Sequence, residues 1–327
     1  MRGALNALFR RRTRPVILMY HRITDYGADP WGLKVTPANF AMQLEYLSGE
    51  RTLLDLATFV SKMKARALPR NAIAITFDDG HVDNLHNGEP ALAAMGASAT
   101  LFVTSGHVGR PEPFWWDELV QLVLDRRDPI NTLIPMGGDS YRLTIPTWEA
   151  DDSERVGWRA CQGPRTSREV AYIEIWKRLR TMPPSAREET LAALRQQNIS
   201  ASQTHIDRAM SHEELRALST RGTFVIGGHT VTHPVLPELS REAQRQEIRD
   251  GKAALETITG QKIIGFAYPY GALDRAARES VISCGFEWAC STKTSGISAG
   301  ICDPFDLPRI TASDTGVAGL KRLLEGV

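Results

Sequence analysis

Two adjacent carboxylates follow an apolar run in the segment ITFDDGHVDN, residues 75–84. The run has the composition of a buried strand, and Asp78 and Asp79 end it with two like charges before a glycine. An Asp-Gly pair is a common turn signal, so the segment alone is equally consistent with a simple turn. A chemical role requires partners elsewhere in the chain that would bring two carboxylates to one point.

Such partners occur in VIGGHTVTHPVL, where His229 and His233 are four residues apart. On a helix that spacing points both imidazoles at one metal ion, but Pro234 disfavours a helix at His233. We therefore expect a tight loop, and two loop histidines without a metal are the alternative for this pattern by itself. Two imidazoles and one carboxylate form a common catalytic metal site that leaves a position for water. One aspartate would then bind the metal and the other would act as a base on water.

Short apolar runs that alternate with helical patterns are expected to position these residues. Strands are predicted over 16–20, 72–77, 99–103, 223–226, 263–267, 286–290 and 307–311. Thr36 is expected to cap a helix that starts at Pro37. Capping boxes are predicted at Ser185 with Glu188 and at Ser211 with Glu214. The alternation predicts a parallel sheet or barrel. In such folds the functional site lies in the loops that follow the strands.

The alternation lapses between about residues 109 and 208, where we predict a mostly helical insertion with a hairpin around Gly137 and Gly138. The expected organisation is a basic N-terminal tip over residues 1–13 and one barrel over 14–327 that this insertion interrupts. Trp115 and Trp116 open a helix of the insertion. They could stack on sugar rings or serve as its hydrophobic anchor.

The composition is that of an ordinary globular protein, with 327 residues, 42% hydrophobic residues and a net charge of +1. This balance gives no reason to expect a nucleic-acid partner. The four cysteines form no C-x-x-C pair, which favours a reducing compartment. We find no pattern of a signal peptide or membrane span and expect a cytoplasmic location. The basic tip could contact an anionic inner membrane surface, or it is simply a solvated chain end.

TFDDG and HTVTH resemble the first two motifs of the polysaccharide deacetylases, the N-deacetylases of chitin, peptidoglycan and nodulation factors. The resemblance implies an α/β fold, a distorted (β/α) barrel of about seven strands. It implies that Asp78 is the general base and that Asp79, His229 and His233 hold a divalent metal, usually Zn²⁺. FAYPYG resembles the third motif, which implies that the backbone N–H of Tyr270 stabilises the oxyanion.

The sequence departs from the family pattern at two places. The third motif usually begins with an arginine that braces the catalytic aspartate, and Ala267 stands there. The late Leu-x-His motif that supplies the general acid is missing, since no histidine follows His233.

Two residues are expected to fill these roles. VILMYH near the start of the chain gives a motif order similar to that of the biofilm poly-N-acetylglucosamine deacetylases, whose barrel is circularly permuted. This similarity implies that His21 is the acid, with a structural role at the strand end as the alternative. Arg309, in LPRI, is expected to replace the missing brace, with a surface ion pair as the alternative.

The resemblance implies a metal-dependent hydrolase that removes N-acetyl groups from an amino-sugar glycan or glycan precursor. The expected partner is an N-acetylated sugar, oligosaccharide or lipid-linked glycan. Two alternatives are another amide or formamide hydrolase on the same barrel and an inactive sugar-binding relative, which Ala267 suggests. The other histidines have no partner pattern and are expected at the surface or as caps: His81, His86, His107, His205 and His212.

Overall fold

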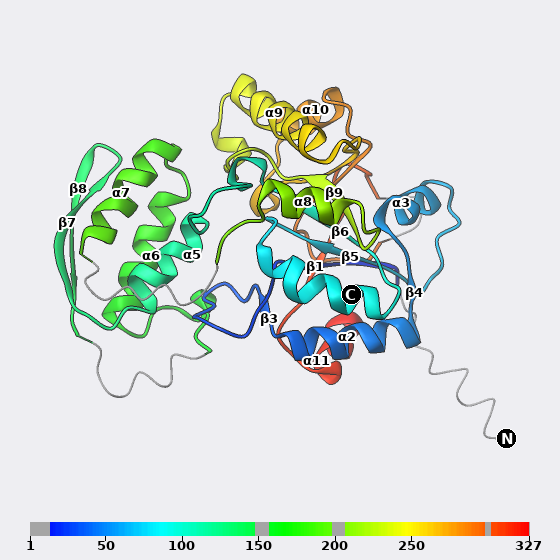
Figure 1. Ribbon diagram of the computed structural model, residues 1–327, viewed down its shortest axis with the longest axis horizontal. Helices are drawn as coiled ribbons and strands as arrows, with labels where there is room; N and C mark the ends of the chain where they lie inside the picture. The colour runs from blue at the N-terminus through cyan, green and yellow to red at the C-terminus, as the bar shows by residue number, and fades with distance from the viewer. Residues whose placement is uncertain (1–13, 148–156, 198–206, 298–301, 327) are drawn as a thin grey trace. The chain divides into compact units, whose positions relative to one another are not determined.

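The structure is a computed structural model that describes residues 14–147, 157–197, 207–297 and 302–326 (Figure 1). Its residues divide into two compact units. The barrel unit contains the described residues up to 24, those of 33–108 and those from 210 onward. The insertion unit contains residues 25–32 together with 109–209. The grouping of residues 25–32 with the insertion was not expected from the sequence.

Parallel strands form the wall of the barrel unit, in the spatial order β11-β10-β9-β6-β5-β1-β12. Their bounds are β1 Val16–Tyr20, β5 Ala72–Phe77, β6 Ala99–Val103, β9 Phe224–Gly228, β10 Gly265–Ala267, β11 Trp288–Cys290 and β12 Ile310–Thr311. A short strand β4 (Thr52–Leu53) also pairs with β5, and β2 (Arg22–Ile23) pairs with β3 (Lys34–Val35). β1 therefore lies between two strands that are distant from each other in sequence.

The segment that leads into β12 closes the row of strands. Leu307 forms a parallel bridge with Cys290 of β11, and its backbone N–H donates to the carbonyl of Ala289 at 2.9 Å. Its own carbonyl accepts from the backbone N–H of Ser291 at 2.9 Å. The predicted distorted (β/α) barrel of about seven strands is thus confirmed.

Helices cover the outside of these strands (Figure 1). They are α2 Pro37–Glu50, α3 Leu56–Lys64, α4 Glu89–Ala94, α8 His212–Ser219, α9 Arg241–Thr259, α10 Arg275–Ser283 and α11 Val317–Glu325. All residues of β1, β5 and β6 are buried, as expected for parallel strands covered on both faces. The cap at Thr36 and the capping box of Ser211 with Glu214 form as predicted.

The insertion unit has a hydrophobic core of its own, built from helices α5 Trp115–Leu119, α6 Ser167–Leu179 and α7 Pro184–Gln196 with the hairpin of β7 Ile130–Met136 and β8 Asp139–Ile145. Trp115 is buried in this core, which favours the anchor role, and Trp116 packs against it. The predicted capping box of Ser185 with Glu188 is wrong. Helix α7 begins at Pro184, so Ser185 lies inside its first turn and no side chain caps it.

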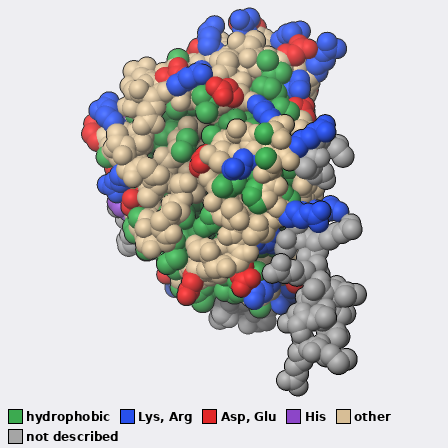
Figure 2. Space-filling view, turned by 90° about the vertical axis from the view of Figure 1, so that its right-hand side faces the viewer, with side chains coloured by type: hydrophobic (Ala, Val, Ile, Leu, Met, Phe, Trp, Pro, Cys, Tyr) green, Lys and Arg blue, Asp and Glu red, His purple; other side chains and the backbone are tan. Residues whose placement is uncertain are grey.

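None of the helices in the described part of the chain is long and apolar enough to cross a membrane. Figure 2 shows basic and acidic side chains together on one face of the molecule, in keeping with the net charge of +1. The basic tip, residues 1–13, and His205 lie outside the described residues.

Candidate active site

The residues that the sequence singled out all lie in the barrel unit, in segments that adjoin its strands. They are His21, Asp78, Asp79, His229, His233, Tyr270 and Arg309. His21 directly follows β1, the two aspartates follow β5, and His229 follows β9. The parallel strands therefore bring these three segments, which are remote from one another in sequence, to one end of the barrel.

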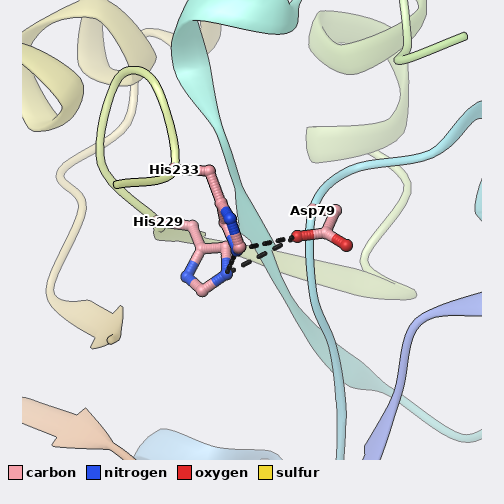
Figure 3. Close-up of side chains that lie close together, drawn as sticks. All are labelled: Asp79, His229 and His233. Atoms are coloured by element: carbon pink, nitrogen blue, oxygen red, sulfur yellow. Dashed lines mark hydrogen bonds and ion pairs between the residues drawn. The ribbon is translucent and has the colours of Figure 1, made fainter. Parts of the chain in front are cut away.

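Asp79, His229 and His233 form a buried group whose possible ligand atoms lie within 4.8 Å of one another. Oδ1 of Asp79 is 3.6 Å from Nε2 of His229 and 3.5 Å from Nε2 of His233. The two Nε2 atoms are 3.1 Å apart. Both rings are turned toward the Asp79 carboxylate (Figure 3). Among the described residues, this is the one group of three or more such side chains that could hold a metal ion.

The hydrogen bonding of His229 suits a metal ligand. Its Nδ1 lies 2.7 Å from the carbonyl oxygen of Ala267. A carbonyl only accepts, so Nδ1 carries the proton and Nε2 keeps a lone pair that faces Asp79. Burial lowers the pKa of His229, although Asp78 and the Ala267 carbonyl act in the opposite direction, and the ring is held neutral. Two imidazoles and one carboxylate at this spacing fit a divalent metal such as Zn²⁺.

The backbone at the site is unusual. Among the described non-glycine residues, five have a positive φ, and four of them belong to the site segments. Their φ values are 75° at Asp79, 67° at Thr230, 56° at His233 and 58° at Tyr270. Such conformations cost about 1–3 kcal/mol each and persist where the surroundings fix them, which is common at functional sites.

Asp78 is held by Arg309, whose side chain is fully buried. Nη1 of Arg309 donates to Oδ1 of Asp78 at 2.6 Å and Nη2 donates to Oδ2 at 2.7 Å. Nη1 also donates to Oγ1 of Thr76, and Nε donates to the carbonyl of Ser291. Burial alone would raise the pKa of Asp78, but the charge and hydrogen bonds of Arg309 lower it overall, so the carboxyl group is ionised.

His21 lies on the same side of the barrel as Asp78. Its Nε2 is 3.9 Å from Oδ2 of that aspartate, and the side chain is partly exposed. The carbonyl of His21 accepts from Nδ2 of Asn84 at 2.8 Å. Asp83 accepts from Nε of Arg22 at 2.8 Å and from the backbone N–H of Ile23 at 3.0 Å. Asp83 and Asn84, at the end of the segment ITFDDGHVDN, thus hold the backbone around His21 in place.

Tyr270 lies in a 3₁₀ turn, Pro269–Gly271, that follows β10. Its ring packs edge-on against the ring of His233, with 4.6 Å between centroids. The FAYPYG segment, which contains Tyr270, is therefore in contact with the HTVTH segment, which contains His233. Gly271 is required here, because a Cβ atom would lie 2.0 Å from Oγ1 of Thr292.

His81 was missed by the sequence analysis, which placed it at the surface or as a cap. It is buried, and its Nε2 lies 3.6 Å from Oδ2 of Asp79, the oxygen that does not face the two histidines. Burial and the nearby Arg22 hold the pKa of His81 well below its usual range, so the ring is neutral. The sequence did offer a signal for this contact, because His81 lies two residues after Asp79, directly after Gly80.

Part of the chain matches a family model described as polysaccharide deacetylase, over residues 65–127 and 181–289. These ranges contain both aspartates, both loop histidines and Tyr270, whereas His21 and Arg309 lie outside them. YxkH of Bacillus subtilis, whose name refers to the same family, is 30% identical over 95 residues. That match covers 28% of this chain and 33% of YxkH, so the chain aligns with about a third of this curated relative.

Several solved structures share the fold. A polysaccharide deacetylase from Bacillus cereus superposes with a TM-score of 0.58 at 19% identity, over 95% of this chain and 69% of that one. The Streptococcus pyogenes deacetylase PplD, solved with acetate, gives 0.59 at 17% identity over 96% and 99% of the two chains. IcaB from Ammonifex degensii gives 0.58 at 18% identity over 95% and 96%.

Proposed function

Because the chain belongs to the polysaccharide deacetylase family, we propose that it is a carbohydrate N-deacetylase. The reaction is hydrolysis of the acetamide of an N-acetylated amino sugar, which consumes one water and gives acetate and a free amine. The observation that carries the proposal is the two-point contact of Arg309 with Asp78. The residue next to it, Asp79, belongs to the candidate metal-binding group with His229 and His233. Acetate, the molecule named with PplD, is the expected product.

The metal site consists of Asp79, His229 and His233, and Zn²⁺ is the metal we propose for this donor set. When bound, a divalent metal supplies Lewis-acid polarisation of the acetamide carbonyl and stabilises negative charge on its oxygen. The protein's part in that chemistry is to fix the tautomer of His229: Nδ1 donates its proton to the carbonyl of Ala267, which leaves the lone pair of Nε2 for the metal.

Asp78 is the proposed general base. Its two oxygens each accept one hydrogen bond from Arg309, and each keeps further acceptor capacity for a water proton. Arg309 is the proposed brace, since a two-point contact fixes the plane of the carboxylate. We propose that Asp78 removes a proton from the water that attacks the carbonyl carbon.

His21 is the proposed general acid, because it lies 3.9 Å from Asp78 in a partly exposed position. It would donate a proton to the nitrogen of the leaving amine as the C–N bond breaks. The backbone N–H of Tyr270 is proposed to donate to the oxyanion. The left-handed backbone of Tyr270, next to His233, supports a special role for this turn.

Two other functions were left open by the sequence. Cleavage of another amide or a formamide would use the same residues and differs in the acid that is released. An inactive sugar-binding relative was suggested by Ala267, and the contact of Arg309 with Asp78 speaks against it. A chain that had lost catalysis has no need of a buried brace on its base.

The experiment that tests the proposal is a product assay on a panel of N-acetylated substrates. Purified protein loaded with zinc is incubated with free N-acetylated sugars, oligosaccharides and lipid-linked glycans, and both acetate and new primary amines are measured. We expect equal amounts of the two products, with the rate of release reduced by about 10²–10⁴-fold in Asp78→Asn and lost after metal chelation. Release of formate alone would favour the formamide hydrolase. Sugar binding without any released acid would favour the inactive relative.

The organisation and location of the chain are part of the proposal. We propose one barrel over 14–327 that an insertion at about 109–208 interrupts, with residues 25–32 packed against the insertion. A lipid-linked substrate, a cytoplasmic location and contact of the basic tip with an anionic inner membrane surface stay predictions. The different substrate forms in the assay panel address the first of these.

A further inference from the structure

The loop between the two metal-binding histidines is held in a costly shape. Its residues Thr230 and His233 both have a left-handed backbone, with φ values of 67° and 56°. Neither residue is a glycine, so each conformation costs about 1–3 kcal/mol and persists only because surrounding contacts offset that cost. This shape brings the two Nε2 atoms to 3.1 Å. Whatever fixes the loop also sets the spacing of the proposed ligands.

Glu247 of α9 makes three of the polar contacts that fix it. Its Oε2 accepts from the backbone N–H groups of Val231 and Thr232, both at 2.9 Å. Its Oε1 accepts from the hydroxyl of Thr232 at 2.8 Å. Consecutive N–H groups that converge on one anion form a favourable binding concavity, and charge-assisted hydrogen bonds are about twice as strong as neutral ones.

Two glycines let the backbone come close enough for these contacts. Gly251 lies one turn after Glu247 on α9, and a Cβ atom there would be 2.9 Å from the carbonyl carbon of Thr230. Gly106 approaches from the segment that follows β6: its N–H donates to the carbonyl of Val231 at 2.9 Å, and a Cβ atom would be 2.6 Å from that oxygen. The loop is therefore clamped from α9 and from the segment after β6.

We infer that Glu247 is a positioning residue for the metal site, and this inference rests on the proposed function. It contacts neither ligand nitrogen. It acts through the backbone of the residues between His229 and His233, and holds the two imidazoles at the spacing that one metal ion requires. A helix residue with no place in the family motifs would thus set metal affinity.

The test measures metal binding directly rather than turnover. Zn²⁺ affinity is determined by competition with a chromophoric chelator, and Co²⁺ is used as a spectroscopic substitute whose visible bands report ligand geometry. The variants are Glu247→Ala and Glu247→Gln, which keeps one acceptor oxygen. The matched control is Glu242→Ala, an exposed residue on the same helix. Thermal unfolding of the metal-free proteins separates loss of fold from loss of the site.

We expect Glu247→Ala to weaken Zn²⁺ binding by about ten-fold or more and to alter the Co²⁺ bands, since partners that orient ligands typically contribute 10–100-fold. Glu247→Gln should lie between wild type and Glu247→Ala, and Glu242→Ala should match wild type. If Glu247→Ala does not fold, an unchanged affinity in Glu247→Gln overturns the inference. The inference is also overturned if Glu247→Ala lowers the unfolding temperature but leaves the Zn²⁺ affinity and the visible bands of bound Co²⁺ unchanged. A wild-type protein that binds no metal instead overturns the proposed metal site itself.

Discussion

Arg309 and Asp78 are 231 residues apart in sequence, yet both oxygens of the carboxylate accept hydrogen bonds from the guanidinium, at 2.6 and 2.7 Å. The pair is buried: the arginine side chain has 0% of its surface exposed and the aspartate 4%. A buried charge without its partner is strongly unfavourable, so each residue depends on the other. The brace that the third motif lacks at Ala267 thus comes from the segment before β12.

Arg309→Met should reduce both stability and activity. Removing one partner of a buried ion pair costs about 3–5 kcal/mol, and the freed Asp78 would lose its fixed orientation. Arg309→Lys keeps the charge but not the two-point contact, so it should recover part of the stability and little of the activity. Denaturant unfolding and acetate release measure the two effects. Arg275→Met, at a side chain 93% exposed, is the control and should change neither.

Asp78→Asn should retain bound zinc and lose turnover by about 10²–10⁴-fold, the usual contribution of a general base. Asparagine has nearly the same shape but cannot take the proton. Metal analysis and turnover are measured on the same preparation. Near-normal turnover in this variant would show that Asp78 is not the base, and the roles of the two aspartates would have to be exchanged.

His229→Ala should fold and lose its metal. Zinc affinity should fall by more than about 100-fold, because even an outer partner of a ligand contributes 10–100-fold. Circular dichroism checks the fold, and zinc content after dialysis checks the site. His86→Ala changes an exposed histidine of the same unit and serves as the control. Equal zinc content in the two variants would remove the site proposed here.

His21→Ala should lower turnover by about 10²–10⁴-fold and leave metal binding nearly intact. The alkaline limb of the pH–rate profile should disappear, because that limb would report loss of the imidazolium proton. The readout is the pH dependence of kcat for this variant and for wild type. A variant that keeps the alkaline limb would assign the acid role to another group.

The sequence predicted the parts of the fold that depend on local patterns. The apolar runs at 16–20, 72–77 and 99–103 became β1, β5 and β6 with those bounds, since few other structures bury five or six consecutive apolar residues. That Asp79, His229 and His233 lie together was predictable because these residues are in segments that follow recognisable strands. The helix start at Ser185 was wrong because proline at the first helical position decided the boundary instead.

Glu247 could not be found in this way, and His81 was missed although its position just beyond Gly80 was a signal. Glu247 binds backbone N–H groups of a remote loop, and no side-chain pattern in the sequence marks such acceptors. On α9 it has the appearance of an ordinary solvent-facing glutamate. His81 has no partner at a helical or strand spacing, since its contact with Asp79 depends on the turn at Gly80, where φ is 92°.

The place of β1 between β5 and β12 has a consequence for the order in which a ribosome delivers this protein. β1 and β5 leave the ribosome before β12 does, and they can pair with each other as soon as both have emerged. Arg309 follows more than two hundred residues later, and until then the charge of Asp78 has no buried partner and must stay hydrated. In the nascent chain, the edge of β1 that pairs with β12 therefore stays open until the segment before β12 emerges and completes the row of strands.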